Sequence, residues 1–180
     1  MFTASTHTCT RRQTGSFKLS ILIAVGLILA GLFAYQTMSG KQAAPKLDYT
    51  NIQGKKIGQQ ALHGKVYMVN FWATSCATCI KEMPHMIASY EKFRAQGLEF
   101  VAVAMSYDPP NYVLNFTETR QLPFHVVLDL EGKIAQAFGD VRLTPTTFLI
   151  DKQGNIIKRY VGEPSFDELN QLLAKELAKT

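Results

Sequence analysis

The sequence is poor in the residues that build metal centres and disulfide frameworks. Its 180 residues include three cysteines and four histidines. Apart from Cys76-Ala77-Thr78-Cys79 there is no C-x-x-C pair, and there is no H-x-x-x-H pair, so the four ligands of a zinc site are missing. His63, His85 and His125 share no metal-ligand spacing, and we expect each to be structural or at the surface. Internal repeats and low-complexity tracts are also absent. We therefore predict a globular chain with no metal and no cofactor.

A surplus of either charge is missing from most of the chain. The net charge of +5 arises largely from Arg11, Arg12 and Lys18, which precede the first acidic residue, Asp48. From Lys41 onward there are 16 basic and 14 acidic residues. A nearly balanced domain gives no electrostatic reason for a nucleic-acid partner, and we predict none. The roughly 140 residues after the N-terminal segment are the usual size of one domain with one core.

Charge is absent from the run Leu19–Tyr35, which is apolar at nearly every position. Its length of about 17 residues is short for a transmembrane helix and slightly long for a signal-peptide core. Cleavage needs small residues three apart, and Leu32-Phe33-Ala34 and Met38-Ser39-Gly40 match this pattern badly. We therefore favour an uncleaved anchor. The predicted organisation is a cytoplasmic tail (1–16), a transmembrane anchor (17–38), a tether (39–46) and a globular domain (47–180).

The cationic flank of the anchor predicts its orientation. Lys and Arg residues beside a transmembrane helix stay in the cytoplasm, so the domain after Met38 is expected outside it. We predict a single-pass protein of the cell inner membrane, with its domain in the periplasm or extracytoplasmic space. Disulfides persist on that side, where Cys76 and Cys79 are expected. Cys9 precedes the anchor and is interpreted as an incidental thiol.

Hydrophobic patterns in the domain alternate between strands and helices. Strands are predicted at Val66–Trp72 and Leu98–Met105, with a helix at Ile80–Gln96 between them, which indicates a parallel crossover. Asp151–Asn155 joins the last two strands as an antiparallel hairpin. The predicted class is α/β, with a mixed central sheet flanked by helices. Further elements are predicted as a hairpin turning at Gln53–Lys55, a helix ending near Thr119, a strand at Val126–Leu128, a helix at Ile134–Phe138, strands at Thr146–Ile150 and Ile156–Val161, and a helix at Phe166–Ala178.

The paired cysteines lie where a buried strand turns into a helix. The free N–H groups and the positive dipole at a helix start stabilise a thiolate, which favours Cys76 as a nucleophile. Cys79 follows within disulfide reach, so we predict that Cys76 attacks a partner disulfide and that Cys79 resolves the mixed disulfide. A permanent staple is a poor alternative, because such a small loop restrains the unfolded chain little.

The segment Val69–Pro84 resembles the active-site segment of the thioredoxin superfamily, particularly its membrane-anchored extracytoplasmic TlpA, ResA and CcmG group. The resemblance continues through Leu122-Pro123-Phe124, Thr144–Asp151 and Val161-Gly162. It implies a thioredoxin-like fold in which Pro145 is a cis-proline facing the disulfide. The backbone before that proline is then left to pair with an extended substrate.

Glu82 matches the acidic residue that follows C-x-x-C in this group. We predict that it exchanges a proton with Cys79 or raises the cysteine pKa values by like-charge repulsion. The alternative is a solvated helix charge like Glu91. Asn70 stands where cytoplasmic thioredoxins have a buried aspartate, which shifts attention to Glu82.

Two residues beside the cysteines depart from the group's pattern. Most relatives have tryptophan at the position of Ser75, and many have proline at that of Thr78. Losing the aromatic ring removes a flat apolar surface on which partners dock. We predict Ser75, Thr144 and Pro145 as substrate-binding residues, with Cys76, Cys79 and Glu82 as catalytic residues.

The predicted function is thiol-disulfide oxidoreductase, reducing disulfides of extracytoplasmic proteins, with cytochrome c maturation as the setting that the resemblance implies. Without a second dithiol or a flavin motif, the chain needs a membrane reductase as electron donor. The alternatives are a thiol oxidant or isomerase, a copper(I) metallochaperone, and a peroxidase. The peroxidase pattern P-x-x-x-T-x-x-C is broken at Val69 and Ala73.

Overall fold

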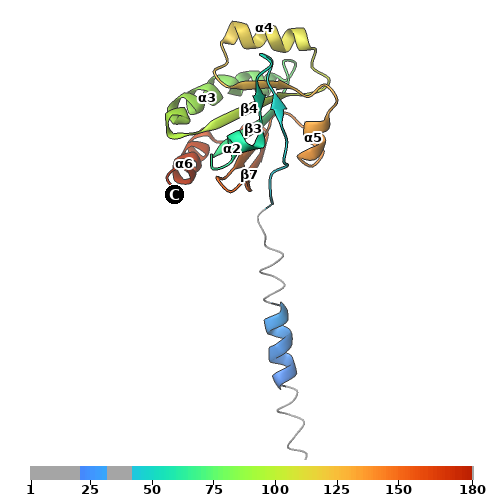
Figure 1. Cartoon of the computed structure of the whole chain (residues 1–180), viewed down its shortest axis with the longest axis vertical. Helices are drawn as coiled ribbons and strands as arrows, with labels where there is room; N and C mark the ends of the chain where they lie inside the picture. The colour runs from blue at the N-terminus through green and yellow to red at the C-terminus, as the bar shows by residue number, and fades with distance from the viewer. Residues whose placement is uncertain (1–20, 32–41, 180) are drawn as a thin grey trace, which may run out of the picture. The chain divides into compact units, whose positions relative to one another are not determined.

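The computed structural model describes residues 21–31 and 42–179, which belong to two units, Met1–Gly40 and Lys41–Thr180. In the first unit, residues 21–31 form a helix (Figure 1). Within the described ranges, no helix is both long and apolar enough to cross a membrane. The predicted tail and both ends of the predicted anchor lie outside the described residues, so the anchor stays a prediction.

A five-stranded sheet forms the centre of the second unit, in the order β5-β4-β3-β6-β7. The central strand β3 (Tyr67–Trp72) pairs in parallel with β4 (Glu99–Ala104) and antiparallel with β6 (Thr146–Ile150). β5 (His125–Leu128) extends the parallel side, and β7 (Ile156–Val161) extends the antiparallel side. The predicted mixed sheet is therefore confirmed.

Helices cover both faces of this sheet because side chains of successive strand residues point to opposite faces. Met68 and Trp72 of β3 belong to a core with α3, α4 and α6, whereas Val69 and Phe71 belong to a second core with α2, α5 and the N-terminal hairpin. Figure 1 shows α3 and α6 beside each other. The helices are α2 (Gln59–Leu62), α3 (Ala77–Phe93), α4 (Pro110–Arg120), α5 (Lys133–Ala137) and α6 (Phe166–Leu177).

Most predicted elements are present with small shifts at their ends. The predicted hairpin pairs β1 (Tyr49–Thr50) with β2 (Lys56–Ile57). Helix α3 begins earlier than predicted, since Cys76 caps it, and it ends in a 3-10 turn before Gly97, whose φ of 96° suits glycine. The short helix α2 was not predicted, because a single turn carries no hydrophobic periodicity.

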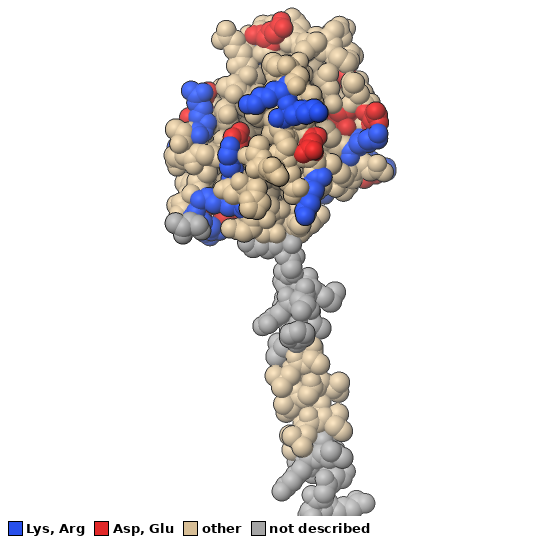
Figure 2. All heavy atoms as spheres, viewed as in Figure 1, with Lys and Arg blue, Asp and Glu red and all other residues tan. Residues whose placement is uncertain are grey.

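Charged side chains of both signs are interspersed on the face of the domain that Figure 2 shows. This agrees with the nearly equal numbers of basic and acidic residues after Lys41.

Candidate active site

The topology brings three connecting segments to one edge of the sheet. In the ladders, Trp72 at the end of β3 pairs with Ala104 at the end of β4, and Phe71 pairs with Thr146 at the start of β6. The carboxyl ends of two parallel strands therefore meet the amino end of an antiparallel one. The segments that follow Trp72, follow Ala104 and precede Thr146 lie together at this edge.

Cys76 and Cys79 form a disulfide at the start of α3, with their Cα atoms 5.2 Å apart. Cys76 is the N-cap, and its Sγ accepts a hydrogen bond of 3.2 Å from the backbone N–H of Cys79. The helix start thus supplies an N–H donor to this sulfur. Cys76 is half-buried, whereas Cys79 is completely buried. Cys76 is therefore the more accessible of the two cysteines.

Glu82 lies on the inward stripe of α3 that also contains Cys79, and only 1% of its surface is exposed. Its Oε1 accepts a 3.2 Å hydrogen bond from Nδ2 of Asn70, and its Oε2 has no hydrogen-bond partner among the described residues. The pKa of Glu82 is raised to about 8, mainly because the carboxyl group is buried; the hydrogen bond from Asn70 opposes this rise, and the nearby charge of Glu163 adds to it. The alternative of a solvated helix charge is wrong.

Asn70 connects this carboxyl group to the sheet. It lies on the same face of β3 as Met68 and Trp72, toward α3, with 1% of its surface exposed. Its Nδ2 also donates a 2.9 Å hydrogen bond to Oγ1 of Thr147 on β6. Asn70, which stands where cytoplasmic thioredoxins have a buried aspartate, therefore donates a hydrogen bond to Glu82.

The peptide bond between Thr144 and Pro145 is cis, as the resemblance implied. Pro145 is buried, and its carbonyl oxygen accepts a 2.8 Å hydrogen bond from the N–H of Gly162. Within the described residues, no backbone hydrogen bond uses the N–H or C=O of Thr144. Ser75 and Thr78 are exposed beside the cysteines.

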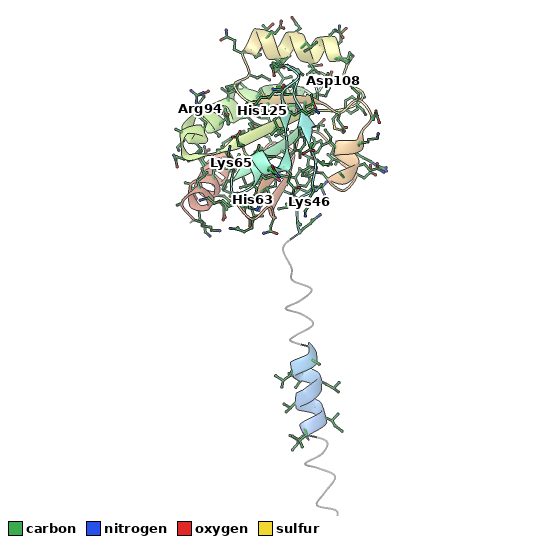
Figure 3. All side chains as sticks on the ribbon, in the orientation of Figure 1. Lys46, His63, Lys65, Arg94, Asp108 and His125 are labelled. Carbon is green, nitrogen blue, oxygen red and sulfur yellow. A yellow bond between two sulfur atoms is a disulfide. The ribbon has the colours of Figure 1, made fainter. Side chains whose placement is uncertain are left out.

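Two residues of the segment after β4, Tyr107 and Asp108, contact the active-site segments although neither was predicted as a site residue. Asp108 is 3% exposed, and its carboxylate accepts hydrogen bonds from the backbone N–H (2.6 Å) and Oγ1 (2.5 Å) of Thr74. The hydroxyl of Tyr107 lies 3.3 Å from Oγ1 of Thr144. Asp108 lies toward the α4 end of the domain in Figure 3. Short-range spacing patterns do not predict these contacts, because the paired residues are 34 and 37 positions apart in the sequence.

The remaining candidates of the sequence analysis lie elsewhere. His63 and His85 are exposed, and the partly buried His125 lies near Asn51 and Glu99. Figure 3 shows His63 and Asp108 toward opposite ends of the domain. In the part of the chain that the structure describes, no group of three His, Cys, Asp or Glu residues is placed to hold a metal ion. Met86 is buried in the core.

A mixed sheet with a C-x-x-C disulfide at the junction of its central strand with a helix defines a thiol-disulfide oxidoreductase of the thioredoxin superfamily. The matches that follow support the TlpA, ResA and CcmG-like group within it. The family model described as Redoxin matches residues 38–173. The chain belongs to this family.

Proteins similar to this chain are named as thiol-disulfide oxidoreductases or thiol:disulfide interchange proteins. The thiol-disulfide oxidoreductase ResA of Bacillus cereus (strain ATCC 10987 / NRS 248) is 36% identical over 165 residues, covering 88% of this chain and 94% of the relative. ResA of Bacillus subtilis (strain 168) is 37% identical over 127 residues, covering 71% and 70%. A crystal structure of a thiol:disulfide interchange protein from Chlorobium tepidum TLS is 28% identical, with a TM-score of 0.71 over 78% of this chain and 99% of that one.

Proposed function

We propose that this thiol-disulfide oxidoreductase reduces disulfides of extracytoplasmic proteins through Cys76 and Cys79. The observation that carries the proposal is the asymmetry of the pair. Cys76 is partly exposed at a helix start, and Cys79 is completely buried one turn later. This arrangement suits a nucleophile that meets the partner and a resolving thiol that does not.

The proposed reaction has two exchanges. The Cys76 thiolate attacks one sulfur of the partner disulfide, forming a mixed disulfide and releasing the other sulfur as a thiolate. The Cys79 thiolate then attacks the Cys76 sulfur, and the electron pair of the broken bond leaves with the partner's second thiolate. The partner gains two electrons, and the protein gains the Cys76–Cys79 disulfide.

Glu82 is proposed to take the proton of Cys79 during resolution and to return it on the next cycle. With a pKa of about 8, its carboxyl group changes protonation near neutral pH, as this role requires. It lies three residues after Cys79 on the buried stripe of the same helix. In this proposal Asn70 orients the carboxyl group through its hydrogen bond.

Substrate binding is proposed for Thr144, Pro145 and Ser75. Thr144 has backbone groups without partners among the described residues, which suits pairing with an extended substrate segment. Ser75 is exposed directly before Cys76. Its small side chain leaves room around the reactive sulfur.

The proposed cellular setting follows from the sequence. The run 17–38 would anchor the chain in the cell inner membrane, with the domain in the periplasm or extracytoplasmic space. A membrane reductase would return electrons to the disulfide, and cytochrome c maturation is the proposed pathway. Protease accessibility of the domain in spheroplasts tests this topology; digestion only after lysis would contradict it.

Trapping of the mixed disulfide tests the reaction. Cys79→Ser leaves Cys76 able to attack but removes the resolving thiol, so partner proteins should accumulate on the variant and be released by reductant. Cys76→Ser is the matched control and should trap nothing. The proposal fails if Cys79→Ser captures no protein while Cys76 still reacts with a thiol reagent.

The direction of electron flow has its own test. A reductant should have a reduction potential near that of thioredoxin, about −270 mV, and should be reduced by a membrane donor. A potential near that of a strong oxidant, about −120 mV, with no reduction by membranes, would favour the oxidant or isomerase.

A further inference from the structure

An exposed aromatic residue lies at the active-site edge, although the position before Cys76 holds serine. Tyr107 follows β4, and 57% of its surface is exposed. Burying a tyrosine side chain against a partner removes a large apolar area from water, so exposed tyrosines are frequent anchors at interfaces. The question is whether this ring is held beside the reactive sulfur.

Two contacts fix the segment that carries Tyr107. Its hydroxyl is 3.3 Å from Oγ1 of Thr144, the residue before Pro145. The next residue, Asp108, accepts two hydrogen bonds from Thr74, which lies two residues before Cys76. Tyr107 and Asp108 therefore join the segment before the cis-proline to the segment before the disulfide. A ring held in this way loses little conformational entropy when a partner covers it.

The two active-site segments that contact the Tyr107–Asp108 segment are uncharged and partly apolar, and the flanking Arg142 forms an ion pair with Asp140. Leu143, next to Thr144, is 66% exposed. Residues 74–78 and 143–145 contain no charged side chain. A partner segment that lies across these residues meets apolar surface and hydroxyl groups, which favours an apolar side chain over a charged one.

We propose that Tyr107 determines substrate specificity: with Leu143, it binds an apolar side chain adjacent to the reacting cysteine in an extended segment of the partner protein. In this way the segment after β4 supplies the aromatic surface that Ser75 lacks. This inference rests on the proposed reaction at Cys76 and adds the chemistry of the segment that the site accepts.

The test uses the reduced full-length chain in detergent micelles and short peptides of the form Ser-Gly-X-Cys-Gly-Ser. The peptide cysteine is joined by a disulfide to thionitrobenzoate, and X is Leu, Ser, Glu or Lys. The Cys76 thiolate attacks the peptide sulfur, and the better leaving group, thionitrobenzoate, departs with the electron pair and is measured by absorbance. Rates of glutathione with the same peptides correct for their intrinsic reactivity.

For the parent chain, we expect the Leu peptide to react about tenfold faster than the Ser peptide, with the Glu and Lys peptides no faster than Ser. Tyr107→Ser should lower this preference to about twofold or less, and Tyr107→Phe, which keeps the ring, should retain most of it. Leu143→Ser, a change in a different segment, should lower it in part. Tyr112→Ser is the matched control, because Tyr112 is 59% exposed on the nearby helix α4 but forms no hydrogen bond with Thr144 among the described residues.

The outcomes separate this inference from the proposed reaction. A parent chain that fails to reduce hydroxyethyl disulfide, a small substrate without a docking segment, contradicts the reaction itself. If that exchange proceeds but the parent does not prefer the Leu peptide, or if Tyr107→Ser keeps the preference, whatever Leu143→Ser does, the role of Tyr107 is refuted. An equal loss in Tyr112→Ser also refutes it.

Discussion

Replacing Glu82 by Gln tests the electrostatics of the buried carboxyl group. The substitution keeps the size of the side chain and the oxygen that accepts from Asn70, but it removes the titrating proton. Because Glu82 is almost fully buried, its ionised form is costly in the folded chain. The variant has no such cost at any pH.

The size of the effect follows from the pKa of Glu82, which rises from 4.5 to about 8 on folding. A raised pKa favours the folded state below pH 4.5 and loses this contribution as pH rises through 8. Each pH unit between these values costs about 1.4 kcal/mol. The stability of Glu82→Gln relative to the parent should therefore increase by about 3 kcal/mol between pH 4.5 and 7.

Urea unfolding of the oxidised domain from Lys41 onward, at several pH values, measures this difference. Glu91→Gln is the matched control, since Glu91 lies exposed on the same helix, and its difference from the parent should stay nearly constant with pH. A Glu82→Gln difference that is equally flat would refute the buried, proton-binding carboxyl group. In the reduced enzyme, the same variant should slow the resolving exchange and flatten its pH profile around 8.

Four further substitutions test the hydrogen bonds and the packing around the site. Asn70→Ala removes the donor that lowers the pKa of Glu82, so an NMR titration of this carboxyl group should shift to higher pH; an unchanged midpoint would contradict the hydrogen bond. Asp108→Ala removes the acceptor for two hydrogen bonds from Thr74, so urea unfolding should show a loss of about 2 kcal/mol, and Thr74→Val a smaller one. Met86→Ala leaves a cavity in the core and should lower the free energy of unfolding by about 3 kcal/mol in the same assay. No measurable loss would show that Met86 is not packed in the core.

The elements that the sequence predicted well are those with local signals. The strand before Cys76 is rich in β-branched and aromatic residues, and the helix after Cys79 has apolar residues at three- and four-residue spacing. Local rules therefore placed the cysteines at a strand-to-helix junction. The cis bond before Pro145 came only from the resemblance, because spacing alone contains no information about a peptide isomer.

The contacts that the sequence did not predict are those made across the sheet edge. Asp108 has no local sequence signal that predicts its partner, and only the register of β3 with β4 brings it to Thr74. Burial of Glu82 likewise depends on how α3 packs against β3. This packing turns one side of the helix toward the core and leaves its other side exposed. These contacts form only when the helices and strands pack together, so local propensity alone does not predict them.

In the proposed role of Tyr107, these cross-edge contacts give the C-x-x-C site a substrate surface without the tryptophan that most relatives have at the position of Ser75. A ring at position 75 would belong to the same segment as the nucleophile. Tyr107 instead reaches the site from β4, and two contacts tie its segment to both active-site segments. Changes at Tyr107 would therefore alter partner choice while the helix start at Cys76 stays the same, so specificity and sulfur chemistry reside on separate segments of the chain.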